Sequence, residues 1–328
     1  MWSKGLRVSK WEIQVLTALR SLYRRSHATR PATRPDCIVD PDLAATRIRA
    51  LLEGPAPAMI ARFGSSELQC LVNFAGVSAG RRAVAGYVRG HSPPWWWDPR
   101  LLRRMYRNAG FFPPTAQAIE EFCRLMLADA PLVDLLGSWL PDERRFDALL
   151  GRAVKVDLEL LNPFFARQPW TQALEHRKVL VVHPFARTIE SQYRRRTLLF
   201  DRELLPRFQL TTLRAVQSIA GEPTPFPSWF AALQSMKDAM DAVDYDICLV
   251  GCGAYGFPLA AHAKRRGRKA VHLGGSLQLL FGIRGHRWED PRYHQVYNYA
   301  ALMNEHWVRP DGQETPRRAG EVEDACYW

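Results

Sequence analysis

Short apolar runs alternate with amphipathic stretches through the second half of the chain, and this alternation limits the possible folds more than any other feature. Strands are predicted over 178–182, 208–213, 247–250 and 269–273. Helical stretches separate them, from about Thr188 to Phe200, from a cap at Ser228 onward, and from the turn after Val250 to Arg266. Runs this apolar are typical of strands buried on both faces. Strand and helix in turn predict an α/β fold, a Rossmann-like parallel sheet with helices on both faces.

The first half follows the same plan. A helix capped by Asp40 ends at Gly54, and an apolar strand over 58–63 leads into a second helix capped by Ser65. Further on, we expect a loop with short strand pieces over 76–90, helices near 99–108 and 114–128, and a strand over 153–160. We divide the chain into a basic segment (1–35), an N-terminal α/β half (36–170) and a C-terminal α/β half (171–328); the two halves can form one domain.

The composition fits a protein with a large buried core. The chain has 328 residues, 47% of them hydrophobic, which suffices for one large or two small domains. No stretch approaches the ~18 apolar residues of a membrane-spanning helix, and no secretory leader is visible near the N-terminus. The six cysteines show no Cys-x-x-Cys spacing, which disfavours a zinc site or a disulfide framework. We therefore expect a cytoplasmic protein.

Positive charge is concentrated at the N-terminus. Residues 1–35 hold eight Lys or Arg and one acid, so they carry more than half of the net charge of +12. The same segment repeats apolar residues at helical spacing, namely Trp11, Val15, Leu19 and Leu22. One interpretation is an element that binds an anionic membrane surface at the inner face of the membrane. The other is a helix that docks on the protein body. No nucleic-acid-binding module is recognisable, so we expect no nucleic-acid partner.

The corner after the strand 58–63 is the first candidate site. Gly64 and two hydroxyl residues begin a helix there, and the N-terminus of a helix attracts anions. Arg62 adds a full positive charge, and Glu67 places a carboxylate beside it. Such a corner suits a phosphate-bearing substrate whose reacting group lies close to the phosphate. An ordinary capped turn with a surface Arg–Glu pair is the alternative.

The same corner carries a family resemblance. The run Arg62-Phe63-Gly64-Ser65-Ser66-Glu67 resembles the Arg-Phe-Gly-Asp-Gly-Glu motif of the GT-D fold glycosyltransferases of bacterial surface-glycan and glycoprotein pathways. The resemblance implies a nucleotide-sugar donor, with a UDP-sugar favoured, bound by the residues from Arg62 to Ser66. It also implies a catalytic role for Glu67 and transfer of the sugar to a glycan or lipid-linked acceptor. Ser65 stands where the family has Asp, so the resemblance leaves open whether a divalent metal assists.

Two later glycine turns resemble those of uncharacterised GT-D-like relatives and are further candidates for the nucleotide-sugar site. Gly251-x-Gly253-x-x-Gly256 has the form of a dinucleotide fingerprint between a strand and a helix. The next strand ends without the acidic residue that holds a ribose hydroxyl. A Rossmann enzyme using NAD(P) or S-adenosylmethionine is therefore kept as an alternative, and tight helix–strand packing is another. Gly274 and Gly275 admit a sugar or phosphate, or form a simple turn.

Other candidates lie on a strand end and in an aromatic loop. His183 is a candidate general base or phosphate donor, and Arg187 is a candidate phosphate ligand. A buried structural histidine and a surface arginine are the alternatives. The loop Trp95-Trp96-Trp97 between prolines is a candidate acceptor site, because three adjacent tryptophans cannot all face one core. A local aromatic cluster is its alternative.

A second Asp-x-Glu pair lies in the predicted strand 153–160. Asp157 and Glu159 would share one face of that strand, where both can meet one ligand or one metal ion, and Asp157 is a candidate catalytic carboxylate. The exposed face of an edge strand is the alternative.

A third interpretation of the whole chain is a non-catalytic membrane partner in which Ser65 marks lost activity.

Overall fold

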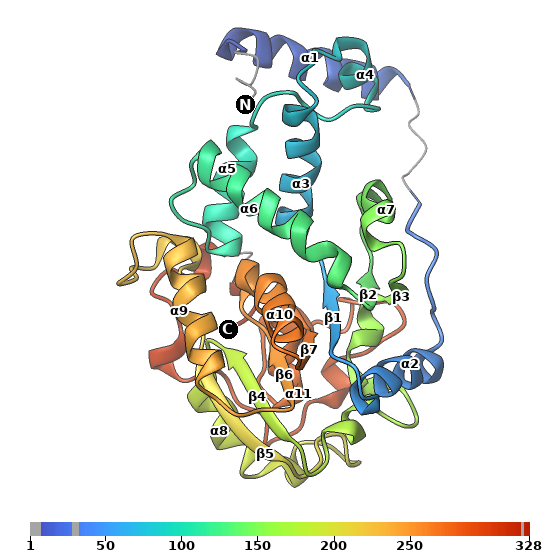
Figure 1. The fold of residues 1–328 in the computed structure, drawn as a ribbon, viewed down its shortest axis with the longest axis vertical. Coiled ribbons are helices and arrows are strands. Elements are labelled where there is room, and N and C mark those ends of the chain that lie inside the picture. Colours follow the sequence, from blue (N-terminus) through green and yellow to red (C-terminus); the bar gives the residue numbers. More distant parts are fainter. Residues whose placement is uncertain (1–7, 28–32, 323–324) are drawn as a thin grey trace.

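The structure is a computed structural model that describes residues 8–27, 33–322 and 325–328. Its centre is one sheet of seven parallel strands in the order β3-β2-β1-β7-β6-β4-β5 (Figure 1). The strands are β1 (Ala58–Arg62), β2 (Leu135–Ser138), β3 (Val154–Asp157), β4 (Lys178–His183), β5 (Gln209–Arg214), β6 (Ile247–Val250) and β7 (Lys269–His272). The two halves of the chain meet within this sheet, where β1 pairs with β7. The expected parallel α/β sheet is confirmed, and it is consistent with a Rossmann-like fold.

Helices cover both faces of the sheet. Because strand residues alternate between faces, Met59 and Ala61 of β1 enter one core while Ile60 enters the other. The first core is covered by α3 (Ser65–Ser78), α5 (Pro99–Ala109), α6 (Ala116–Asp129), α9 (Trp229–Asp241) and α10 (Gly256–Arg265). The second is covered by α2 (Pro41–Glu53), α8 (Ala186–Tyr193) and α11 (Leu277–Leu280). The short helices α7 (Asp147–Leu150) and α12 (His286–Glu289) lie in connections.

Side-chain caps begin most of the longer helices where the sequence places them. Asp40 accepts the N–H of Leu43 at the start of α2, and Ser228 accepts the N–H of Ala231 at the start of α9. The expected cap at Ser65 is wrong. The N-cap of α3 is Gly64, which has no side chain and therefore supplies no side-chain cap.

Several other boundaries differ from the expectation. The strand predicted over 153–160 ends at Asp157, and a 3-10 helix over Leu158–Leu161 follows it. The expected loop over 76–90 contains the end of α3 and a further helix, α4 (Val84–Arg89). The helix expected from Thr188 to Phe200 is shorter and ends at Tyr193. The sequence analysis assigned no strand to the region that forms β2.

The N-terminal helix α1 (Lys10–Ser26) lies apart from the sheet. It begins with a capping box, in which Ser9 and Glu12 bond each other's backbone N–H groups, and it packs against α4 at one end of the molecule (Figure 1). Residues 28–32, which follow α1 in the chain, lie outside the described residues. Within the described ranges, no helix is both long enough and apolar enough to cross a membrane.

Candidate functional site

A cavity lies at the carboxyl ends of β1, β7, β6 and β4. The helices that follow β1 and β6 pack on one face of the sheet, whereas those that follow β7 and β4 pack on the other. Neighbouring connections therefore diverge, and ligands of open α/β sheets bind in the crevice that such divergence leaves. The cavity has a volume of about 460 Å³. Its lining includes three arginines and two carboxylates: Arg34, Arg62, Arg287, Glu67 and Glu159.

The corner after β1 forms one wall of this cavity, as the sequence predicts. Arg62, Gly64, Ser65 and Ser66 all line it. The guanidinium of Arg62 lies 5.5 Å from the centre of the Trp139 ring, and its Nε is buried with no hydrogen-bond partner among the described residues. The N-cap residue of α3, Gly64, supplies no side-chain cap, and Ser65 and Ser66 of the first turn of α3 line the cavity beside Arg62. A buried donor of this kind is costly to leave unsatisfied, which favours an anionic ligand.

The carboxylate of Glu67 folds back over the start of its own helix. A Cβ atom added to Gly64 would overlap that carboxylate, so glycine is required at this position for the side chain of Glu67 to lie where it does. The φ angle of Gly64 is −74°, an ordinary value for any residue. The requirement for glycine is therefore one of space and not of backbone conformation. Glu67 lines the cavity, next to Ser65 and Ser66.

His183 lines the cavity from the end of β4 and is a neutral ring. Burial lowers the pKa of His183 to about 3, so the imidazole carries no charge at neutral pH. Its Nδ1 accepts the N–H of Phe185 at 3.0 Å, which leaves the ring proton on Nε2. Of the two roles considered for His183, this state suits a hydrogen-bond donor to an anionic oxygen better than a general base.

Some glycines of the two turns are favoured by their backbone conformation, and others are required because a Cβ atom would not fit. Gly253 and Gly274 line the cavity with φ angles of +57° and +66°, which favour glycine. A Cβ on Gly251 would lie 2.6 Å from the carbonyl oxygen of Gly274, so these two turns touch at the cavity floor. Gly275 also lines the cavity. Gly256 lies outside the cavity, and a Cβ there would overlap the buried ring of His272.

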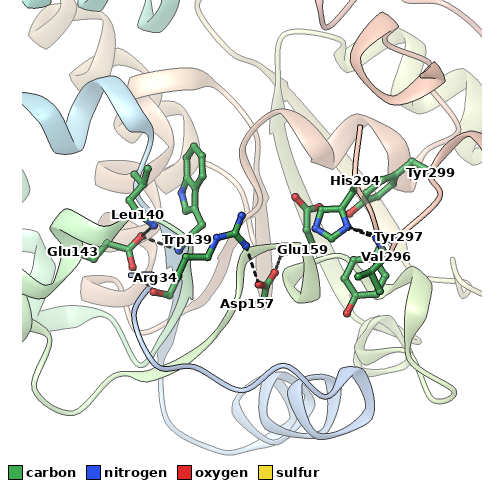
Figure 2. Close-up of polar contacts among 11 residues, drawn as sticks. Arg34, Trp139, Leu140, Glu143, Asp157, Glu159, His294, Val296, Tyr297 and Tyr299 are labelled. Atoms are coloured by element: carbon green, nitrogen blue, oxygen red, sulfur yellow. Dashed lines mark hydrogen bonds and ion pairs between the residues drawn. The ribbon is translucent and has the colours of Figure 1, made fainter. Parts of the chain in front are cut away.

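Asp157 and Glu159 do not share a face, because the strand ends between them. Figure 2 shows Asp157 turned toward Arg34, 3.7 Å away, and Glu159 turned toward His294 and Tyr299. The Asp157 carboxylate also accepts the N–H of Glu159 at 3.0 Å. Only Glu159 lines the cavity. The expectation that the pair presents two carboxylates from one strand face is wrong.

Glu159 is a partly buried carboxylate whose hydrogen-bond partner is a tyrosine. Its carboxylate accepts a hydrogen bond from the hydroxyl of Tyr299. That hydroxyl oxygen in turn accepts a hydrogen bond from the amide of Asn162 at 2.9 Å. Burial raises the pKa of Glu159, and the hydrogen bond from Tyr299 opposes that rise only in part. A carboxyl group with a raised pKa at a cavity wall is suited to exchange a proton with a bound substrate.

Aromatic side chains form a wall that the sequence analysis did not find: Trp139, Phe185, Tyr293, Tyr327 and Trp328. Trp139 is held by its Nε1, which donates to the carbonyl of Phe63 at 3.1 Å, and by Glu143, whose carboxylate accepts the backbone N–H of Trp139 (Figure 2). Trp139 directly follows β2, so finding that strand in the sequence would have placed the tryptophan at the strand ends.

Several predicted site residues lie away from the cavity. Phe63 is fully buried and stacks on Phe257 at 4.9 Å between ring centres. The guanidinium of Arg187 donates a hydrogen bond to the side chain of Gln313, and the backbone N–H of Arg187 donates to Glu314. The tryptophans of the 92–99 loop do not line the cavity: Trp95 and Trp96 pack on Tyr87, and Trp97 stacks on Phe74. Their proposed contact with an acceptor remains a prediction.

Comparison with known proteins adds no identification. No family model, curated protein or solved structure matches this chain. Over the described part of the chain, no group of three or more His, Cys, Asp or Glu side chains is placed to hold a metal ion. The site is therefore characterised by its geometry: a cationic, helix-lined corner, two carboxylates and an aromatic wall around one cavity.

Proposed function

We propose that this chain is a GT-D-like glycosyltransferase. It moves a sugar from a nucleotide-sugar donor, with a UDP-sugar favoured, to a glycan or lipid-linked acceptor in the synthesis of bacterial surface polysaccharide or glycoconjugate. The proposal depends most on one observation, the buried Nε of Arg62 that lacks a partner among the described residues and lies near the start of α3, whose N-cap glycine supplies no side-chain cap. The resemblance of the 62–67 motif supplies the reaction class.

The proposed chemistry uses residues of the same cavity. The acceptor hydroxyl attacks the anomeric carbon, and the sugar–phosphate bond breaks with its electron pair leaving on the nucleoside diphosphate. Arg62, the first N–H groups of α3 and the neutral Nε2–H of His183 would stabilise the negative charge of the departing diphosphate. Glu67 or Glu159 would take the proton of the acceptor hydroxyl.

The aromatic wall gives the donor a place to stack. Trp139 lies over Arg62, and Tyr293 lies on the same cavity wall as Glu159 and His294. A nucleobase or a sugar ring can pack on such faces, while the diphosphate lies at the Arg62 corner. The proposed location is the cytoplasm, where nucleotide sugars are available as donors.

The alternative is an NAD(P)- or S-adenosylmethionine-dependent enzyme using the turn 251–256. One observation bears on it: Gly256, the third glycine of the fingerprint, lies against the His272 ring and outside the cavity. Gly251 and Gly253 still line the cavity, so the alternative is tested beside the main proposal and not discarded.

Calorimetric titration of the purified protein with UDP tests the proposal. We expect UDP to bind, and Arg62→Ala to weaken its affinity by about tenfold to a hundredfold, because a charge-assisted hydrogen bond contributes ~1.5–3 kcal/mol. Arg103→Ala removes an exposed cation of α5 that does not line the cavity, and it should leave UDP affinity unchanged.

The same titration is run with GDP, NAD and S-adenosylmethionine. Equal UDP affinity in wild type and Arg62→Ala would show that the diphosphate does not lie at this corner. Binding of NAD or S-adenosylmethionine without any binding of UDP or GDP would favour the Rossmann alternative.

A further inference from the structure

The helix α1 has two apolar faces, and only one of them packs on the protein. Ile13 and Leu16 contact the cluster formed by Tyr87, Trp95 and Trp96. Arg20 adds to this inner face, with its guanidinium 4.7 Å from the centre of the Tyr87 ring. Trp95 and Trp96 of the 92–99 loop thus form part of the surface on which α1 docks.

The second apolar face is the stripe predicted from the sequence, and it points to solvent. Trp11 is 70% exposed, Leu22 60% and Leu19 45%, while Val15 is half-buried. Val84 of the neighbouring α4 is 46% exposed as well. The helix does dock on the body, as one of the two interpretations expects, but it does so through a different face and leaves this stripe uncovered. An apolar stripe that stays exposed to water on a helix that is already docked indicates a binding surface for a partner.

The surroundings of this stripe are strongly basic. Within 8–27 and 79–91, which cover α1 and α4, there are seven Lys or Arg and one acid, Glu12. That acid is already neutralised, since it caps its own helix and lies 3.4 Å from Arg82. Lys10, Arg24 and Arg25 are exposed at the two ends of α1. A helix with an exposed Trp–Leu stripe and flanking cations is typical of elements that lie in the interface of an anionic bilayer.

We propose that the outer face of α1, made of Trp11, Val15, Leu19 and Leu22, binds the surface of a membrane that contains anionic lipids. The apolar stripe enters the boundary between headgroups and acyl chains, and the basic side chains of α1 and α4 remain among the headgroup phosphates. The inference does not rest on the proposed function. Figure 1 shows α1 and α4 together at one end of the molecule, where a flat surface can reach both.

A second copy of the chain is the competing occupant of the stripe. Pairing two α1 helices through this face would bring their basic flanks together, and the only acid on α1 is already paired within its own subunit. Like charges brought close together oppose such pairing, whereas anionic headgroups are attracted by the same charges. Charge complementarity therefore favours the membrane.

Vesicle sedimentation with the full-length protein tests the proposal. One set of vesicles contains phosphatidylcholine alone, and the other contains phosphatidylcholine and phosphatidylglycerol in a three-to-one ratio. We expect binding to the anionic vesicles, weaker binding at high salt, and little binding to the neutral ones. Replacing Trp11, Leu19 and Leu22 together by Ser should lower the partition coefficient by more than tenfold. Arg24→Gln with Arg25→Gln should lower it by about thirtyfold.

Two matched controls accompany these variants. Val39, Leu43 and Leu198 are exposed apolar residues elsewhere, and their joint replacement by Ser should leave vesicle binding unchanged. Arg47 and Arg152 are exposed cations elsewhere, and Arg47→Gln with Arg152→Gln should also leave it unchanged.

Four results would overturn the proposal: equal binding to neutral and anionic vesicles, wild-type binding by the stripe variant, a fall in its melting temperature beyond that of its control, or a dimer in size-exclusion chromatography that the stripe variant abolishes. The last result would assign the face to a second copy. Nucleotide titration needs no vesicles, so failure here is distinguishable from failure of the proposed function.

Discussion

At the scale of single residues, the candidate site depends on a glycine that makes room for a carboxylate. Gly64 has an ordinary backbone conformation, yet a Cβ there would overlap the carboxylate of Glu67. The motif therefore couples two positions three residues apart. Both positions are predicted from the sequence, Gly64 as part of the nucleotide-sugar site and Glu67 as a catalytic group, but the sequence does not link one to the other. The coupling becomes visible only when the side chain of Glu67 is seen to fold back.

We predict that Gly64→Ala and Glu67→Gln impair the same step. Glu67→Gln keeps the size of the side chain and removes a base, so turnover should fall by about a hundredfold or more at unchanged melting temperature. Gly64→Ala should also slow turnover, because the added methyl displaces the carboxylate, and the double variant should be no slower than Glu67→Gln. Steady-state kinetics with a UDP-sugar measures all three.

Gly312→Ala is the matched control, because a Cβ at Gly312 meets no atom within 4 Å. Wild-type turnover by Glu67→Gln would reduce Glu67 to a helix-start acid that complements the helix dipole. Multiplicative effects in the double variant would mean that Gly64 and Glu67 act separately.

At the scale of elements, sequence reasoning found most strands of the sheet and missed β2. The strands β1, β4, β6 and β7 are predictable because their apolar residues are all buried on one face of the sheet or the other. β2 ends in Gly137-Ser138, a pair that is typical of a turn. The direction in which the Glu159 side chain points was also mispredicted, because no residue in 153–160 indicates the change from strand to 3-10 helix.

We predict that Gly256→Ala destabilises the fold and leaves nucleotide binding intact. In a helix, alanine would normally be favoured over glycine by ~1 kcal/mol. At the start of α10, however, the new Cβ would overlap His272, which is buried in the interior and cannot move aside. Overpacking of this kind costs about 1–3 kcal/mol. Denaturant unfolding measures the loss, with Gly320→Ala, which meets no neighbouring atom, as the control. Unchanged stability together with lost NAD or UDP binding would instead make Gly256 a ligand contact.

At the scale of the whole molecule, two buried neutral histidines end strands of the sheet that are separated by one strand. His183 ends β4 and His272 ends β7, with β6 between them. The pKa of each ring is lowered to about 3 from an ordinary value of 6.5, mainly by burial and, for His272, also by the charge of Arg62. The unfolded chain therefore binds protons more readily than the folded chain below pH 6.5, and this difference couples the stability of the fold to pH.

We predict that the free energy of unfolding falls as the pH is lowered from 6.5 toward 5. Each buried histidine contributes stability that is complete above pH 6.5 and is lost at up to ~1.4 kcal/mol per pH unit below it. Glu159 acts in the opposite sense, because its raised pKa favours the protonated folded state, so its contribution is complete at low pH and is lost as the pH rises above 4.5.

The net slope of the wild type thus understates the histidine effect, and a variant isolates it. His272→Asn removes one titrating ring, whose Nδ1 has no hydrogen-bond partner among the described residues. Its unfolding free energy should fall less steeply than that of the wild type over this range, whereas His91→Asn, which replaces an exposed ring, should match the wild-type slope. Urea unfolding at closely spaced pH values measures the three slopes, and parallel lines for wild type and His272→Asn would show that His272 does not link protonation to folding.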